Sequence, residues 1–275
     1  MSETTYVLGC DPAELERLDQ QAAFHEQPTR LLLARAGITR GMRVLDLGTG
    51  LGHVARLAGE LTGPTGAVVG LDRTPVLAVA RQRAEAAGEH HVTFVEGDLT
   101  EWRSPEPFDA IVGRLVLFHV ADPVVAVRHQ LNNLRPGGLF VALDFDIGAS
   151  RTEPAVPIAA EAVGWIDRAF SAAGASPRIG ARLGPILSAA GLSNVATVGI
   201  QGYIPPNDPV GAVLLSGVVR SMAGEIVRRG IATTEQIGLE TLYQRIADAV
   251  RDADAVFLPP SLVGAWGTYQ PTARA

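Results

Sequence analysis

Three aspartates, Asp46, Asp72 and Asp98, stand at or near the ends of apolar segments that are typical of buried parallel strands. In open α/β sheets, ligands bind at the carboxyl ends of such strands. Asp46 is followed by the glycine turn Gly48-Thr49-Gly50-Leu51-Gly52, and then by apolar residues at helical spacing over residues 53–61. A strand, a glycine turn and a helix N-terminus together predict a binding site of nucleotide size.

The spacing of the glycines indicates which ligand the turn would accept. The dinucleotide fingerprint G-x-G-x-x-G, counted from Gly48, requires glycine at the position of His53. A carboxylate at the end of the strand, as at Asp46, would repel a pyrophosphate but would pair with an ammonium group. Asp72 lies about 20 residues beyond the turn, where an acidic residue can accept hydrogen bonds from ribose hydroxyls.

With Asp46 followed by G-x-G-x-G, the sequence resembles the class I S-adenosylmethionine-dependent methyltransferases. The resemblance is specific over residues 41–146 and looser beyond them. It implies an α/β fold: a doubly wound, mostly parallel seven-stranded sheet with helices on both faces, Rossmann-like, plus N-terminal and inserted cap helices. It also implies S-adenosyl-L-methionine as the cofactor. The cofactor-binding residues expected from it are Tyr6, Asp46, Gly48, Thr49, Gly50, Gly52, Asp72, Arg73, Asp98, Leu99 and Arg114.

The resemblance assigns a part of the cofactor to most of these residues. It implies that Asp46 holds the methionine amino group and that Asp98 accepts from the adenine amino group, with the Leu99 backbone alongside. Arg73 would lie along the adenine face, with a solvated arginine as the alternative. The alternative role for Asp98 is to cap a helix. The alternative role for Tyr6 is packing without a cofactor contact.

A histidine is the first candidate for proton transfer, because imidazole titrates near neutral pH. Arg114 ends the fourth expected strand, and His119 follows a few residues later. The family usually has a polar residue and a histidine at these two places, so both residues fit the resemblance. Orienting the cofactor is the alternative role for His119, and His25 and Tyr203 are weaker candidates for the base. Trp165 and Tyr203, with His119, are the expected substrate contacts, and packing of the helix over 161–173 is the alternative for Trp165.

No metal is expected. Asp144 and Asp146 share one face of a strand by its period of two, but no third oxygen ligand is evident near them.

The expected organisation is a helical lid over residues 1–40 and a methyltransferase domain over residues 41–275, with helical cap insertions at about 150–180 and 205–252. In the lid, a helix over 14–24 would be followed, after Pro28, by a second over 29–36. The apolar faces of the late helices suit either cap packing or a homodimer surface. Further helices are expected over 75–87, 161–173, 181–190, 209–229 and 235–251, and late strands over 194–203 and 256–269.

Composition narrows the class of protein. The chain has 275 residues, a hydrophobic content of 47% and a formal net charge of −6, which argues against a general nucleic-acid binder. Its one cysteine, Cys10, excludes an internal disulfide framework. We see no charged-then-apolar leader and no apolar run long enough to cross a bilayer, so we expect a cytoplasmic protein without a membrane partner.

The function expected from these features is methyl transfer from S-adenosylmethionine to a small-molecule acceptor. The leader Tyr6-Val7-Leu8-Gly9 and the closing Val263–Gly267 look like a bacterial natural-product subgroup of the family. High Ala, Gly and Arg usage agrees with a GC-rich bacterial source. The alternative is a protein that binds the cofactor on the same fold but acts as a cyclase or a non-methylating scaffold.

Overall fold

A computed structural model describes residues 12–73 and 76–271 of the chain, which divides into two compact units. We call them the sheet unit, with Phe24–Asp144, Gly180–Gly199 and the stretch from Val263, and the helical unit, with Phe145–Ile179, Ile200–Leu262 and the stretch up to Ala23. The two expected insertions fall in the helical unit. The expected lid over residues 1–40 is divided between the units after Ala23.

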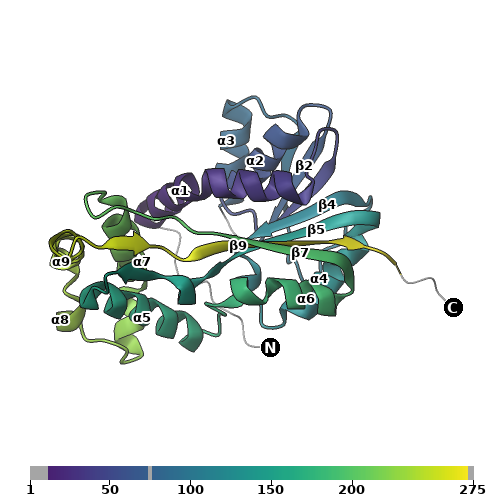
Figure 1. Cartoon of the computed structure of the whole chain (residues 1–275). Helices are drawn as coiled ribbons and strands as arrows, with labels where there is room; N and C mark the ends of the chain where they lie inside the picture. The colour runs from purple at the N-terminus through teal and green to yellow at the C-terminus, as the bar shows by residue number, and fades with distance from the viewer. Residues whose placement is uncertain (1–11, 74–75, 272–275) are drawn as a thin grey trace. The chain divides into compact units, whose positions relative to one another are not determined.

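The sheet unit is built on seven strands in the order β3-β2-β1-β4-β5-β9-β7 (Figure 1). The pairs β1–β2, β2–β3, β1–β4 and β4–β5 are parallel. The chain runs outward from β1 to β3 and then returns to β4 on the other side of β1, and ligands bind where such an order reverses. The seven-stranded, mostly parallel sheet is confirmed. The strands are β1 (Arg43–Leu47), β2 (Ala67–Asp72), β3 (Val92–Glu96), β4 (Phe108–Arg114), β5 (Leu134–Asp146), β7 (Leu192–Ile200) and β9 (Ser261–Tyr269).

Helices cover the sheet because its central strands are apolar on both faces. Val44, Leu45 and Ile111 have no exposed surface. Helix α2 packs on β1 and β2, α3 packs on β3, and α4 lies beside α6 (Figure 1). The helices are α2 (His53–Thr62), α3 (Leu77–Ala86), α4 (Pro123–Gln130), α6 (Leu183–Ala190) and the second half of α1 (Pro12–Ala36), with short 3-10 turns η1 (Leu117–His119), η2 (Leu131–Asn133) and η4 (Ile179–Arg182).

The helical unit has its own apolar interior. Helix α5 packs against α7 and α9, and α7 packs against α9. Trp165 is only 5% exposed within this interior, so its surface is used for packing. The elements are the 3-10 turn η3 (Ile147–Ala149), helices α5 (Pro157–Ala172), α7 (Val210–Arg228), α8 (Thr234–Ile237) and α9 (Leu239–Asp252), and the antiparallel strand pair β6 (Arg151–Glu153) and β8 (Val256–Leu258).

The expected break of the N-terminal helix at Pro28 is wrong. Helix α1 runs without interruption from Pro12 to Ala36. A proline inside a helix removes one backbone donor, but the Thr29 hydroxyl donates to the carbonyl oxygen of His25 at 2.6 Å across the same turn. Leu32 and Leu33 are completely buried just beyond it. Packing of the residues beyond Pro28 therefore carries the helix through the proline.

Three late elements also differ from expectation. The helix expected over 235–251 is two helices, because Gly238 has a φ of +55° and ends α8. The strand expected over 256–269 is divided into β8 and β9 at Pro259 and Pro260, which have no backbone N–H for a ladder. Strand β7 lies over Leu192–Ile200 and so begins and ends earlier than the expected 194–203.

One helix of the described residues, α7, is long and apolar enough to cross a membrane by length and composition, with a mean hydropathy of 1.5. The expectation that the chain has no apolar run long enough to cross a bilayer is therefore wrong. Part of this helix is buried against α5 and α9, and a buried core helix of a globular protein meets the same criteria.

Candidate functional site

The glycine turn between β1 and α2 needs glycine for two different reasons. Gly48 has a φ of +62°, and a Cβ there would lie 2.6 Å from the Val116 side chain. Gly50 has a φ of +53°, but a Cβ there would meet no described atom within 4 Å. Gly48 is thus required by packing, whereas Gly50 borders open space through which a ligand can approach the backbone.

The turn is held in place by its neighbours. Asp72, at the end of β2, accepts a hydrogen bond from the Gly50 backbone N–H at 2.8 Å. The Thr49 backbone N–H donates to the carbonyl oxygen of Leu71 at 3.1 Å. Gly52, with a φ of +81°, begins α2. The end of β2 is therefore hydrogen-bonded to the turn that follows β1.

Asp46 is the most unusual group of the site. It is only 1% exposed, and its Oδ2 accepts from the Thr49 hydroxyl at 2.6 Å. Its Oδ1 is buried and accepts no hydrogen bond of good geometry among the described residues, although the Ala55 backbone N–H lies near the carboxyl group. Burial raises the pKa of Asp46 to about 7, although the Thr49 hydrogen bond and the Arg114 charge oppose the rise. A buried carboxylate oxygen without a donor is costly, and a bound cationic group would supply the donor.

Arg114 brings a cation to the same end of the sheet. It ends β4, the strand that lies beside β1 with Val112 opposite Asp46. Its Nη1 donates to the Thr29 hydroxyl of α1 at 3.0 Å. Desolvation lowers the pKa of Arg114, and the Asp46 carboxylate counteracts this. Sequence reasoning placed Arg114 in the site but missed Thr29, whose signal was a hydroxyl on the otherwise apolar face of Leu32 and Leu33.

Asp98 follows β3 but is occupied by its own loop. Its Oδ1 accepts from the Thr100 backbone N–H at 2.8 Å and from the Thr100 hydroxyl at 2.6 Å. Its Oδ2 lies 3.4 Å from the Arg73 guanidinium. Partial burial pushes the pKa of Asp98 up, but the Thr100 hydrogen bonds and Arg73 outweigh it, so this pKa lies below its ordinary value. These contacts cap a turn and not a helix, and an adenine amino group would have to share the carboxylate.

The loop that carries Leu99 rests on a buried amide network, which sequence reasoning missed. The Gln130 side chain donates to the Leu99 carbonyl oxygen, and its own oxygen accepts from the Asn133 side chain at 2.8 Å. Asn133 in turn accepts from the Ser104 backbone N–H at 2.9 Å. Gln130 and Asn133 are both buried, so this network fixes the backbone of residues 99–104.

The two candidate histidines are held neutral by their surroundings. Burial, with a further contribution from the Arg73 charge, lowers the pKa of His119 to about 4. Burial and the Arg114 charge lower the pKa of His25 to about 3. His119 ends the η1 turn, and its ring meets that of Phe118 edge-on at a centroid distance of 4.9 Å. At neutral pH both imidazoles have a lone pair to offer, but both resist taking up a proton.

The other expected contacts do not belong to the sheet unit. Trp165 and Tyr203 are in the helical unit, where Trp165 is buried and Tyr203 is 70% exposed. Tyr6 lies outside the described residues. The helical unit also has a pocket of about 180 Å³ between the 204–209 segment and α9, and none of the described residues that line it is an expected site residue.

Among the described residues, no group of three His, Cys, Asp or Glu side chains is placed to hold a metal ion. Asp144 is completely buried in β5, and its Oδ2 accepts from the Phe118 backbone N–H at 3.3 Å. In this position it braces the η1 turn that ends with His119.

These residues fit a ligand with a ribose and an amino-acid end that carries an ammonium group. The buried Oδ1 of Asp46 lacks a donor among the described residues, and an ammonium group would provide one. Gly50 opens onto free space where a Cβ would stand. Asp72 lies next to the turn at the distance along the sequence that suits ribose hydroxyls. S-adenosylmethionine combines these groups.

Comparison with known proteins finds methyltransferases that are similar to part of the chain. Residues 38–170 match the family model described as "Methyltransferase domain". A ubiquinone/menaquinone biosynthesis C-methyltransferase, UbiE of Pseudomonas aeruginosa, is 33% identical over 125 residues, which cover 44% of this chain and 49% of that protein. The chain thus spans about half the length of the curated relatives it matches.

Two solved structures share the fold. The YcgJ protein of Bacillus subtilis has a TM-score of 0.56 and 21% identity, covering 90% of this chain and all of that one. The [4+2]-cyclase SpnF has a TM-score of 0.51 and 20% identity, covering 90% of this chain and 81% of that one. Residues 38–170 are thus similar to methyltransferase domains, and the solved structures share the fold of the chain.

Proposed function

We propose that this protein transfers the methyl group of S-adenosylmethionine to a small-molecule acceptor of bacterial secondary metabolism. The observation that carries the proposal is the buried Oδ1 of Asp46, which lacks a hydrogen-bond donor among the described residues beside a glycine turn open to solvent. Natural proteins rarely leave a buried carboxylate oxygen in this state unless a ligand completes it.

The residues of the sheet unit would divide the cofactor among them. Asp46 would take the ammonium group, and Asp72, which already braces Gly50, would take the ribose hydroxyls. The loop of Asp98 and Leu99 would border the adenine, with Asp98 shared between the base and Thr100. When bound, S-adenosylmethionine would supply an electrophilic methyl group, which an electron pair of the acceptor would take in line as the carbon–sulfur bond breaks and S-adenosylhomocysteine leaves.

The chain's main contribution to rate is therefore alignment and exclusion of water. Holding reactants in line is worth effective molarities of order 10⁵ M or more in well-oriented systems. No covalent intermediate on the protein is needed. A site of fixed backbone, such as the loop held by Gln130 and Asn133, is suited to this task.

His119 would act as a hydrogen-bond acceptor before it acts as a base. Burial lowers its pKa to about 4, so it is neutral at pH 7 and takes up a proton reluctantly. It can orient a hydroxyl or amine through its lone pair. It becomes an effective base only if the acceptor brings negative charge that stabilises the imidazolium, and this favours an acidic acceptor, such as a phenol or an activated ring carbon.

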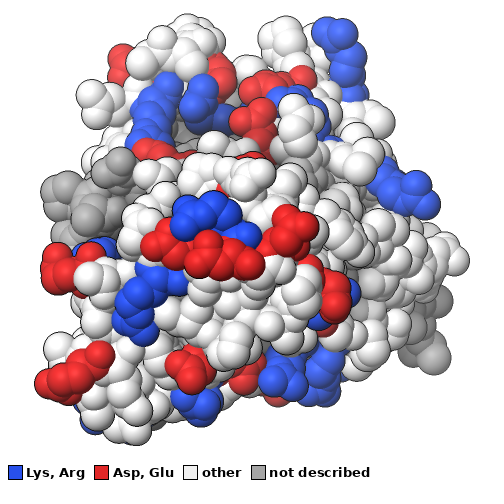
Figure 2. Space-filling model, turned by 60° about the vertical axis from the view of Figure 1, so that its left-hand side comes forward, with Lys and Arg blue, Asp and Glu red and all other residues white. Residues whose placement is uncertain are grey.

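Charge and composition support a small acceptor over a nucleic acid. The net charge is −6, and on the face drawn in Figure 2 acidic and basic groups are interspersed, without one continuous basic area. The relative from Pseudomonas aeruginosa is by its name a C-methyltransferase of quinone biosynthesis. Ring carbon therefore belongs among the acceptor atoms to test.

The test is incubation of the protein with methyl-labelled S-adenosylmethionine and a panel of phenols, hydroquinones and amines. We expect S-adenosylhomocysteine to form with one acceptor class, and its formation to be lost in Asp46→Ala. Asp122→Ala is the control, because Asp122 is an exposed carboxylate of the same unit that caps α4. Equal turnover in Asp46→Ala and Asp122→Ala would contradict the proposed site.

The alternative is a cofactor-binding protein that does not methylate, acting as a cyclase or a scaffold. Calorimetry separates the two. Binding of S-adenosylmethionine without S-adenosylhomocysteine formation from any member of the panel would favour the alternative. Absence of binding to the wild-type protein would exclude both.

A further inference from the structure

The second half of α1 contributes a polar group to the site that no family motif contains. Thr29 has no exposed surface, yet its hydroxyl makes two hydrogen bonds. It donates its one hydrogen to the His25 carbonyl oxygen at 2.6 Å, so toward Arg114, at 3.0 Å, it can only accept. The Arg114 guanidinium therefore donates to an oriented lone pair of Thr29, which is 85 residues away in the sequence.

We propose that Thr29 is a positioning residue that holds Arg114 to receive the carboxylate of the cofactor's amino-acid end, while Asp46 receives its ammonium group. This inference rests on the proposed function and deepens it. An amino-acid zwitterion has one positive and one negative group, and the adjacent strands β1 and β4 present one carboxylate and one guanidinium at the same end. Arginine suits a carboxylate because its planar fork can donate two parallel hydrogen bonds.

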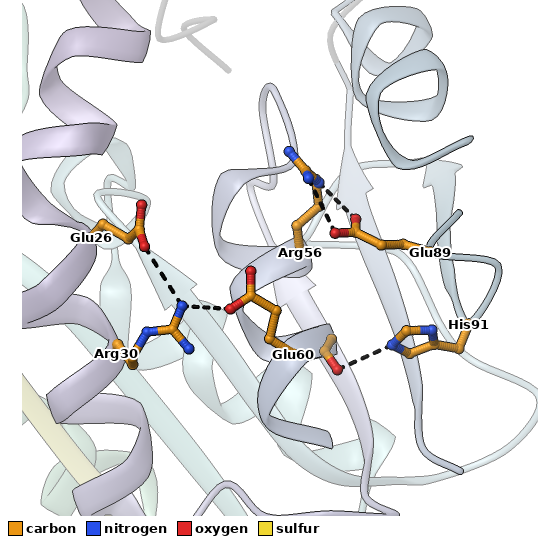
Figure 3. Close-up of polar contacts among 7 residues, drawn as sticks. Glu26, Arg30, Arg56, Glu60, Glu89 and His91 are labelled. Atoms are coloured by element: carbon orange, nitrogen blue, oxygen red, sulfur yellow. Dashed lines mark hydrogen bonds and ion pairs between the residues drawn. The ribbon is translucent and has the colours of Figure 1, made fainter. Parts of the chain in front are cut away.

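A positioning residue must itself be held, and α1 is anchored on two sides. On its outer side, Arg30 lies 2.5 Å from Glu60 of α2 and 3.6 Å from Glu26 of its own helix (Figure 3). On its inner side, Leu32 lies against Gly264 of β9, where an added Cβ would come within 3.0 Å of it. Arg30 and Leu32 lie within one helical turn of Thr29, so these contacts hold the part of α1 that carries its hydroxyl.

The charges around Arg114 favour the same assignment. The Asp46 carboxylate attracts the Arg114 guanidinium. Among the described residues, however, these two groups do not form an ion pair within 4.0 Å. His25, the other titratable group that α1 brings close, is neutral at pH 7 and adds no competing cation. Arg114 is therefore tethered by a neutral hydroxyl and keeps its charge for a ligand.

The test compares two ligands that differ only in the amino-acid end. S-adenosylhomocysteine has the carboxylate and the ammonium group, whereas 5′-methylthioadenosine has the same thioether and nucleoside without them. In Thr29→Val, which keeps the shape and removes the oxygen, we expect the Kd of S-adenosylhomocysteine to rise about tenfold. The Kd of 5′-methylthioadenosine should stay within about twofold, and Thr29→Ser should restore the affinity for S-adenosylhomocysteine.

Thr62→Val is the matched control, because Thr62 is also a completely buried helical threonine that donates to a backbone carbonyl, that of Gly59 at 3.3 Å. It should change neither Kd. Thermal unfolding of each variant, and Arg114→Lys as a second variant, guard against a simple loss of folding. Arg114→Lys keeps the charge but not the fork, so it should reproduce the selective loss.

Equal weakening of both ligands in Thr29→Val, or no weakening, would overturn the positioning role and leave the proposed function standing. If the wild-type protein binds 5′-methylthioadenosine and S-adenosylhomocysteine equally well, the zwitterion assignment is wrong. If it binds neither ligand, the positioning role and the proposed function fall together.

Discussion

The two units of this protein bury very different groups. The sheet unit places polar side chains inside: Asp46, Thr29 and Gln130 each have at most 1% of their surface exposed. The helical unit fills its interior with apolar groups, such as Trp165 and Met222, and carries acidic and basic pairs on its exposed helix surfaces, as between Arg251 and Asp248. Buried polar groups cost free energy unless they are satisfied.

This difference separates a region shaped for a ligand from one shaped for packing. In the sheet unit, Asp46 lies in β1 and Arg114 ends β4, the two strands between which the strand order reverses. In the helical unit, the expected substrate residue Trp165 is used for packing, and Tyr203 is exposed. Substitutions should therefore affect binding in the first unit and stability in the second.

The largest expected effect is on stability in the helical unit. Trp165→Ala should lower the free energy of unfolding by about 3–5 kcal/mol, because it leaves a cavity in a packed interior. The affinity of the remaining folded protein for S-adenosylhomocysteine should be unchanged. Chemical denaturation and calorimetry measure the two quantities. A loss of affinity with normal stability would instead make Trp165 a ligand contact.

Asp46→Asn should do the reverse in the sheet unit. Loss of the buried charge should weaken S-adenosylhomocysteine binding by about 100-fold or more, since truncating one partner of a buried charged pair costs about 2–5 kcal/mol. Because burial raises the pKa of Asp46 from 3.8 to about 7, the free wild-type protein loses stability as pH rises through this window. Each pKa unit corresponds to about 1.4 kcal/mol.

The asparagine variant should lack that loss and be the more stable of the two at pH 8 without ligand. Thermal unfolding from pH 4 to pH 8, with and without S-adenosylhomocysteine, checks both parts. A wild-type protein with the same pH dependence as Asp46→Asn would show that the carboxylate is not strained in the free state.

Gly50→Ala and Gly88→Ala form a matched pair within the sheet unit. Both glycines have a positive φ, +53° and +69°, and a Cβ at either would meet no described atom within 4 Å. Each alanine should cost about 1–2 kcal/mol of stability through backbone strain. Only the Gly50 variant should also lose affinity for S-adenosylhomocysteine, by about tenfold, because its methyl group would occupy the ligand's path. Equal affinities in the two variants would move the ligand away from the turn.

The smallest effect is expected from the neutral histidine. Burial lowers the pKa of His119 from 6.5 to about 4, so the unfolded chain binds a proton that the folded chain does not. Stability is therefore full above pH 6.5 and is lost as pH falls toward 4. His119→Gln should show a shallower loss over this window in acid titrations of stability. If turnover of the variant keeps the wild-type rate and pH profile, His119 is neither a base nor an orienting group.

Much of the sheet unit could be predicted from local patterns. An apolar run that ends in glycines at Gly48 and Gly50 has few alternatives to a strand and a tight turn, because side chains rarely adopt their φ values. The positions of Asp46 and Asp72 follow from where their strands end. The helical unit has no such motif, so its element bounds, as at Gly238 and at Pro259, were predicted less well.

The sequence by itself determined the first strands, the turn and the two carboxylates beside it, because each depends on neighbours within a few residues. The tertiary structure alone decided how the polar groups pair. In the tertiary structure Thr29 is hydrogen-bonded to Arg114, α1 continues through Pro28, and Asp98 is hydrogen-bonded to Thr100. Burial also moved the pKa values of Asp46 and His119, because desolvation depends on every element packed around a group and leaves no mark in its local sequence.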